Sequence, residues 1–137
     1  MSGNKMNEHD FKEYLAAFNS RDYEKLHSKY FHPDVKLYTL GYILDGQKGV
    51  KDFYKFFHEY IDETIGFIDF HPIKNGFFGE VSMSLKAKKA LTPEITKAHG
   101  FSRLTPVPEG ATYDTILFVD YRLKDGKLHQ IRCAEFI

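Results

Sequence analysis

The sequence predicts an α+β domain in which N-terminal helices pack in a curved, mostly antiparallel sheet, leaving a cone with an open end. Apolar side chains recur at helical spacing in much of residues 7–60, whereas β-branched and aromatic residues form extended runs in the rest. Helices segregated from a mostly antiparallel sheet define the α+β class. A length of 137 residues favours one domain, spanning residues 1–137.

The composition excludes several classes of protein. Nineteen basic residues balance nineteen acidic ones, so the positive charge of a nucleic-acid-binding protein is missing, and nothing favours a membrane surface. No apolar run approaches the roughly 20 residues that span a bilayer, and the N-terminus has no signal-peptide core. The single cysteine, Cys133, lies in an apolar strand, which favours a buried, inert thiol. We therefore expect a soluble, cytoplasmic protein with no nucleic-acid or membrane partner.

Three helices are predicted before residue 61. Residues 1–6 are polar and expected to be disordered, and Asn7 is a suitable N-cap for the first helix. Its apolar face consists of Phe11, Leu15 and Phe18, with Tyr14 beside them. A second helix has a face of Tyr23, Leu26 and Tyr30, and a third runs from about residue 47 to 60 with Val50, Phe53, Tyr54, Phe57 and Ile61 on its buried side.

Five strands are predicted, of which only one precedes the third helix. His32-Pro33-Asp34 predicts a turn before that strand, at residues 35–42. Further strands are expected at residues 65–71 and 80–89. Residues 91–112 contain three of the five prolines and no clear period, so we expect a long loop that gates a pocket.

The C-terminal quarter predicts a long β-hairpin. Asp125-Gly126 is a strong turn signal between two runs of strand-forming residues. In its second strand, Ile131, Cys133 and Glu135 share one face because side chains alternate with period two. A carboxylate on an apolar face is desolvated, which disfavours its charged form and suits a general acid or base.

Glu135 is therefore the first candidate for a catalytic residue, and Tyr113 is the second. Tyr113 opens the other strand of the hairpin, where we expect it to approach Glu135 and to donate to a developing oxyanion. The alternatives are a glutamate paired with a neighbouring cation or exposed at the end of the sheet, and a rim tyrosine with its hydroxyl in water.

Three other side chains are weaker catalytic candidates. Asp69 and His71 are two residues apart on one strand, so they could handle protons together, or simply emerge into solvent before Pro72. His99, in the long loop, could reach over a ligand, although lone loop histidines are usually exposed. Across the hairpin, an ion pair between Asp120 and Arg132 is the favoured interpretation of that aspartate.

No metal or cofactor site is predicted. The seven histidines show no paired metal-ligand spacing, and neither a glycine-rich phosphate loop nor a G-x-S-x-G elbow is present. We therefore expect a pocket that uses no cofactor.

The order of elements resembles that of the NTF2-like superfamily, and within it the SnoaL-like proteins. The matching stretches are F-K-E-Y-L-A-A-F-N-S-R-D-Y-E-K-L, F-H-P-D-V, D-G-Q-K-G-V-K-D-F and L-K-D-G-K-L-H-Q-I-R-C-A-E-F. The resemblance covers nearly the whole chain and implies a ligand pocket inside the cone. We expect its wall to include Tyr14, Tyr38, Phe53, Phe57 and Leu117. One departure is the first-strand stretch L-Y-T-L-G, which lacks the aspartate of ketosteroid isomerases.

Two functions follow from the resemblance. One is a cofactor-independent isomerase, cyclase or dehydratase that acts on a hydrophobic, oxygenated natural-product intermediate. The other is a non-catalytic module that binds a small ligand or dimerises. We also expect a homodimer, because Ile116, Phe118, Ala134 and Phe136 form an apolar stripe on the second face of the hairpin.

Overall fold

The computed structural model describes residues 5–135, and the expectations for residues 1–4 and for Phe136 lie outside this range. The elements follow in the order α1 (Glu8–Asn19), α2 (Tyr23–Lys25), the π-helix η1 (Leu26–Tyr30), β1 (Phe31–Thr39), β2 (Tyr42–Asp45), α3 (Gly46–Tyr60), β3 (Ile61–Ile73), β4 (Gly76–Ala87), α4 (Pro93–Ala98), β5 (Thr112–Lys124) and β6 (Lys127–Glu135). No helix in this range is both long and apolar enough to cross a membrane.

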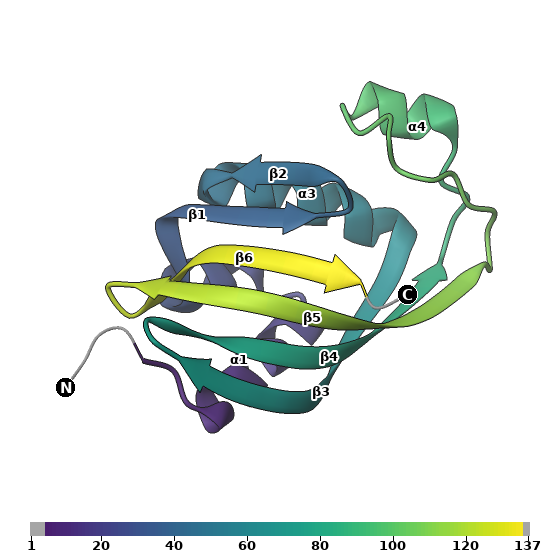
Figure 1. Ribbon diagram of the computed structural model, residues 1–137. Coiled ribbons are helices and arrows are strands. Elements are labelled where there is room, and N and C mark those ends of the chain that lie inside the picture. Colours follow the sequence, from purple (N-terminus) through teal and green to yellow (C-terminus); the bar gives the residue numbers. More distant parts are fainter. Residues whose placement is uncertain (1–4, 136–137) are drawn as a thin grey trace.

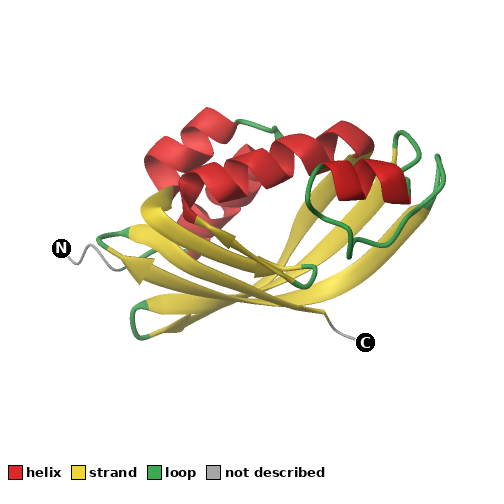
Figure 2. Ribbon diagram, turned by 90° about the horizontal axis from the view of Figure 1, so that it is seen from above, coloured by secondary structure: helices red, strands yellow, loops and turns green. Residues whose placement is uncertain are grey.

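The predicted α+β architecture is confirmed. One six-stranded sheet has the order β2-β1-β6-β5-β4-β3, and its pairings are antiparallel except for that of β1 with β6. The sheet curls, and α1 and α3 lie against its concave side (Figures 1 and 2). Inward-facing side chains of the strands and the apolar faces of α1 and α3 together form the core.

The core around α1 is aromatic. Phe11 is fully buried, and its ring lies 5.0 Å from that of Phe77 and 5.3 Å from that of Tyr121. Gly79 on β4 makes this packing possible, because a Cβ atom there would lie 2.6 Å from Phe11. The predicted N-cap of α1 is also confirmed: Asn7 and Asp10 form a capping box with hydrogen bonds of 2.8 and 3.0 Å.

The region between the second and third helices differs from the prediction. The expected strand at residues 35–42 is a hairpin of two strands, which turns at Leu40 and Gly41, both with positive φ. The expected turn at His32-Pro33-Asp34 is extended chain within β1, since a proline also suits an irregular edge of a strand. The sheet therefore has six strands rather than five.

Three further regions differ from the prediction. Ile61, expected on α3, is the first residue of β3. The expected loop at residues 91–112 is not a plain loop: Thr92 caps α4, Leu91 pairs with Val107 in a β-bridge, and Thr112 already belongs to β5. Within the expected disordered segment 1–6, Met6 packs against the core.

Candidate active site

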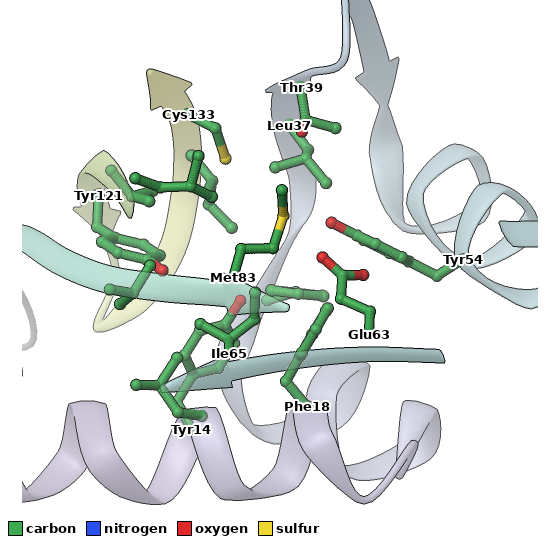
Figure 3. A pocket seen from close by; sticks show the side chains of 16 residues that line it. Tyr14, Phe18, Leu37, Thr39, Tyr54, Glu63, Ile65, Met83, Tyr121 and Cys133 are labelled. Carbon is green, nitrogen blue, oxygen red and sulfur yellow. The ribbon is translucent and has the colours of Figure 1, made fainter. Parts of the chain in front are cut away.

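The concave side of the sheet encloses a small pocket with an inner and an outer chamber. The inner chamber has a volume of about 50 Å³ and the outer one about 110 Å³. The chambers share a wall, which consists of Thr39, Tyr54, Glu63, Met83, Leu117 and Cys133. Most of the lining is apolar, so the few polar groups in it stand out (Figure 3).

Glu63 is the buried carboxylate of this pocket. It lies on β3, faces inward with Ile61 and Ile65, and is 6 % exposed. Its Oε1 atom lies 2.8 Å from Nε2 of His58, which is equally buried at the end of α3. An interior carboxylate is stable only when it is paired or hydrogen-bonded, and His58 provides that partner.

The hydrogen bonds of His58 indicate its tautomer. Nδ1 of His58 lies 2.7 Å from the hydroxyl of Tyr23, whereas that hydroxyl lies 3.3 Å from the carbonyl oxygen of Tyr54. The shorter distance favours donation from Tyr23 to Nδ1, so the ring proton is on Nε2 and is donated to Glu63. Burial, opposed by Arg21, raises the pKa of Tyr23, which keeps its hydroxyl a donor.

Glu63 retains one oxygen for a ligand. Its Oε2 atom makes no hydrogen bond to any group within residues 5–135, and the carboxylate points into the pocket beside the hydroxyl of Tyr54 (Figure 3). A carboxylate oriented through one oxygen and free at the other has the geometry of a general base.

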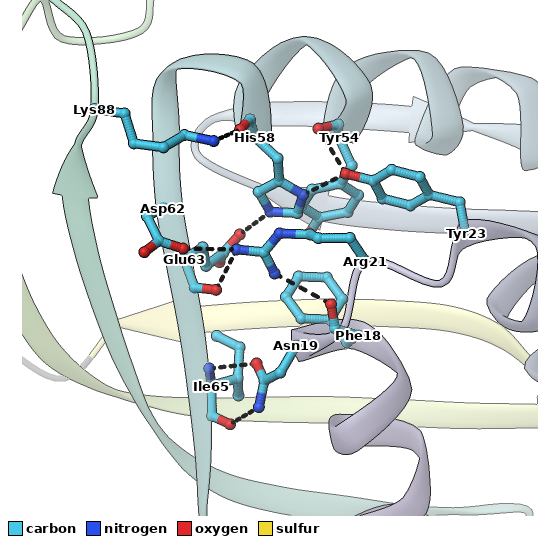
Figure 4. Close-up of polar contacts among 10 residues, drawn as sticks. All are labelled: Phe18, Asn19, Arg21, Tyr23, Tyr54, His58, Asp62, Glu63, Ile65 and Lys88. Carbon is cyan, nitrogen blue, oxygen red and sulfur yellow. Dashed lines mark hydrogen bonds and ion pairs between the residues drawn. The ribbon is translucent and has the colours of Figure 1, made fainter.

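The backbone around Glu63 is held by side chains from outside the sheet (Figure 4). Asn19, at the end of α1, makes two hydrogen bonds of 2.9 Å to the backbone of Ile65. Arg21 donates to the carbonyl oxygen of Glu63 and forms an ion pair of 3.3 Å with Asp62. These contacts fix the start of β3 against α1 and so orient Glu63.

Three tyrosines face the same pocket. Tyr14, Tyr54 and Tyr121 line the inner chamber, and within the described part of the chain their hydroxyls have no hydrogen-bond partner. Burial raises the pKa of each phenol, and the charge of Glu63 adds to this effect at Tyr54. All three hydroxyls are therefore protonated donors at neutral pH.

The expected contact between Tyr113 and Glu135 is present, but its surroundings differ from the expectation. The Tyr113 hydroxyl donates a hydrogen bond to Glu135 Oε2, as the hairpin predicts. Glu135 lines only the outer chamber and is exposed, and Tyr113 is 48 % exposed. The predicted inward face of Ile131 and Cys133 is confirmed, yet the strand leaves the core before Glu135, which is consequently hydrated rather than desolvated.

The other expected catalytic residues lie away from the pocket. Asp69 and His71 do pair, at 3.2 Å, but both are exposed and turned away from it. Together with Glu80 they form a surface group of metal-ligand type. His99 stacks on Phe56 outside both chambers, and no residue of the expected gate at 91–112 lines either one.

The expected ligand-binding wall is partly present. Tyr14 lines the inner chamber, Phe57 the outer one, and Leu117 both. Tyr38 does not, because its neighbours Leu37 and Thr39 face the pocket and alternation turns Tyr38 outward. Phe53 is buried one layer behind, stacked on Phe57 at 5.3 Å.

Cys133 and Asp120 behave as the sequence predicts. Burial raises the pKa of the Cys133 thiol to about 12, so it is protonated and unreactive at neutral pH. Asp120 pairs with Arg132 across the hairpin and with Arg122 at 2.7 Å on the outer face of the sheet.

Comparison with solved structures identifies the fold. A candidate polyketide cyclase from Pseudomonas putida superposes with a TM-score of 0.76 at 15 % identity, over 100 % of this chain and 93 % of the other. A SnoaL-like polyketide cyclase from Agrobacterium tumefaciens gives a TM-score of 0.70 at 14 % identity, over 96 % and 93 %. TerC, co-crystallised with polyporic acid, gives 0.68 at 17 % identity, over 98 % and 92 %.

The chain therefore has the NTF2-like fold, as its sequence predicts. At the level of sequence, no family model and no curated protein matches the chain. Because one fold hosts many activities, the function is inferred from the geometry of the pocket.

Proposed function

We propose that the protein is a cofactor-independent enzyme of the isomerase or cyclase type, acting on a hydrophobic, oxygenated natural-product intermediate. The observation that carries this proposal is the buried Glu63 carboxylate, oriented by His58 and facing a pocket lined with tyrosine hydroxyls. The structural likeness to polyketide cyclases supports the same class of chemistry.

In the proposed reaction, Glu63 removes a proton from a carbon next to a carbonyl group. The C–H bond breaks, its electron pair forms an enolate, and the proton moves to Glu63 Oε2. Tyr54 or Tyr14 donates a hydrogen bond to the enolate oxygen, which is the atom where negative charge develops. Return of the proton to a different carbon isomerises the substrate. Alternatively, attack of the enolate carbon on a second carbonyl closes a ring, and the proton on Glu63 passes to the alkoxide oxygen that forms.

His58 and Tyr23 act as positioning residues in this scheme. The hydrogen bond from His58 Nε2 holds one carboxylate oxygen, so the other is presented to the ligand. Tyr23 fixes the ring tautomer that allows this donation. Both residues lie behind Glu63 and contact no ligand.

The proposal is tested by deuterium uptake, which requires no knowledge of the true substrate. A panel of small enolisable ketones is incubated with the protein in D₂O, and exchange of the α-protons is followed by NMR. Glu63→Gln keeps the size of the side chain and removes the base, so exchange should slow by roughly 10²–10⁴-fold. Glu109→Gln, an exposed glutamate outside the pocket, is the matched control. Wild-type protein that exchanges no ketone of the panel contradicts the proposal.

A non-catalytic ligand-binding module is the second candidate, because most of the pocket lining is apolar and can hold a ligand without any chemistry. Chambers of about 50 and 110 Å³ are below the roughly 300–1,000 Å³ of typical ligand sites, so that ligand would be small. This alternative predicts that small ketones bind in the pocket without any α-proton exchange.

A further inference from the structure

The polar groups of the pocket lie in three successive zones. Tyr14 and Tyr121 line only the inner chamber, and Glu63 and Tyr54 lie in the wall that both chambers share. Glu135 lines only the outer chamber, where β6 ends. A ligand that fills the pocket therefore meets hydroxyl donors at its buried end and a second carboxylate at the mouth.

The carboxylate at the mouth accepts hydrogen bonds. Tyr113, which lines neither chamber, donates its hydroxyl proton to Glu135 Oε2, so what Glu135 still offers a ligand is the lone pairs of its carboxylate oxygens. The hydrogen bond to Glu135 raises the pKa of Tyr113, which keeps that proton in place. A ligand group at the mouth is favoured when it is a donor, such as a hydroxyl or an amine.

The charge of the pocket lining has one sign. Among the lining residues within 5–135 there is no lysine, arginine or histidine, while Glu63 and Glu135 are both carboxylic acids. Arg21 is directed at the backbone of Glu63 and at Asp62, outside the lining. A carboxylate or phosphate on a ligand would therefore approach acidic groups without a cation to balance it.

We infer that Glu135, held by the hydrogen bond from Tyr113, forms a specificity subsite for a small molecule without an anionic group, with its carbonyl oxygen at the buried end and a hydrogen-bond donor at the mouth. Leu40, Phe57 and Leu85 provide apolar surface beside this subsite for the body of the ligand. The direction assigned to the carbonyl rests on the proposed function, whereas the selection by charge and by donor rests on the mouth alone.

Three probes that differ only in their para substituent test this inference. They are acetophenone, para-hydroxymethyl acetophenone and para-acetylbenzoate, and their affinities for the intact protein are measured by NMR titration at neutral pH. The hydroxymethyl compound should bind most tightly and the benzoate most weakly. The repulsion between two like unit charges roughly 4 Å apart in water corresponds to about a fivefold difference in affinity.

Substitutions at the mouth assign this selectivity to Glu135. Glu135→Gln should raise the affinity for para-acetylbenzoate about fivefold. It should also reduce the difference in affinity between the hydroxymethyl compound and acetophenone. Asp114→Asn is the matched control. Asp114 is an exposed acid next to Tyr113 at the start of β5, and it lines neither chamber. The inference is overturned if the ratios of the three affinities are the same in Glu135→Gln as in wild type. Equal affinities of the wild-type protein for the three probes, or no binding of any of them, overturn it as well.

The outcomes separate this inference from the proposed function. Selective binding without deuterium exchange refutes the enzyme and leaves the subsite standing. Deuterium exchange that is equally fast for all three probes, with equal affinities, refutes the subsite and leaves the enzyme standing.

Discussion

Loss of the His58 partner should destabilise the protein strongly, because Glu63 would keep its buried position without a hydrogen-bond donor. The side chains of His58 and Glu63 are 4 % and 7 % exposed and their contact measures 2.8 Å. Removing one member of a buried pair costs about 3–5 kcal/mol. We therefore expect His58→Leu to lower the free energy of unfolding by about 4 kcal/mol, a large part of the roughly 5–15 kcal/mol available to a domain.

Urea denaturation of four proteins measures this effect: wild type, His58→Leu, Glu63→Gln and the double variant. Because the cost arises from an uncompensated carboxylate, the double variant should be clearly more stable than the sum of the single effects predicts. The surface pair of His9 and Glu13, at 3.4 Å, supplies the control, and His9→Leu should change stability by a small fraction of that amount. Additive single effects, or a cost for His58→Leu below about 1 kcal/mol, would refute the account of the pair.

Three further predictions concern other parts of the molecule. Burial, with Lys51 nearby, lowers the pKa of His27 below its unfolded value of 6.5. The stability that neutral His27 contributes is therefore present above pH 6.5 and is lost as the pH falls toward the folded pKa. His27→Leu should flatten this loss of stability in urea titrations at several pH values, and an unchanged slope of stability against pH would contradict it. Alkylation of Cys133 by iodoacetamide at neutral pH should be much slower in the native protein than in urea, whereas equal rates would contradict the high thiol pKa. The protein should form a homodimer through its outer sheet face, where Phe78 and Phe118 are each 40 % exposed, and Phe78→Lys should weaken the dimer. Sedimentation of the wild-type protein as a monomer at micromolar concentration would exclude this interface.

The fold could be predicted from the sequence because its signals are local. The N-cap at Asn7, the apolar face of α1 and the Asp125-Gly126 turn depend on a few adjacent residues, and each is found as expected. The sequence does not predict the short helix α4, since six residues are too few to show a periodic apolar face, although Thr92 followed by Pro93 is a helix-start signal.

The main carboxylate of the site was missed for an identifiable reason. Ile61 fits the helical spacing of α3, so the next strand was expected only from residue 65. A strand beginning at Ile61 shows the alternation Ile61, Glu63, Ile65 and Phe67, with one carboxylate on an apolar face. That is the same signal that pointed to Glu135.

The partners of Glu63 could not be predicted in the same way. The contact between His58 and Glu63 depends on the angle at which the chain passes from α3 into β3. Tyr23 reaches His58 from a separate helix, 35 residues away. Such contacts are set by the packing of whole elements, for which these residues carry no local pattern.

Deuterium uptake by the Glu63→Gln and Glu135→Gln variants, measured side by side at saturating acetophenone, which has no polar group for Glu135 to select, tests the central claim most directly. The structure gives one carboxylate a buried position and a histidine partner, and the other an exposed position at the mouth. We expect exchange to fall by roughly 10²–10⁴-fold in Glu63→Gln and to remain within a few-fold of wild type in Glu135→Gln. The reverse order, with Glu135→Gln inactive and Glu63→Gln active, would contradict the assignment of Glu63 as the base.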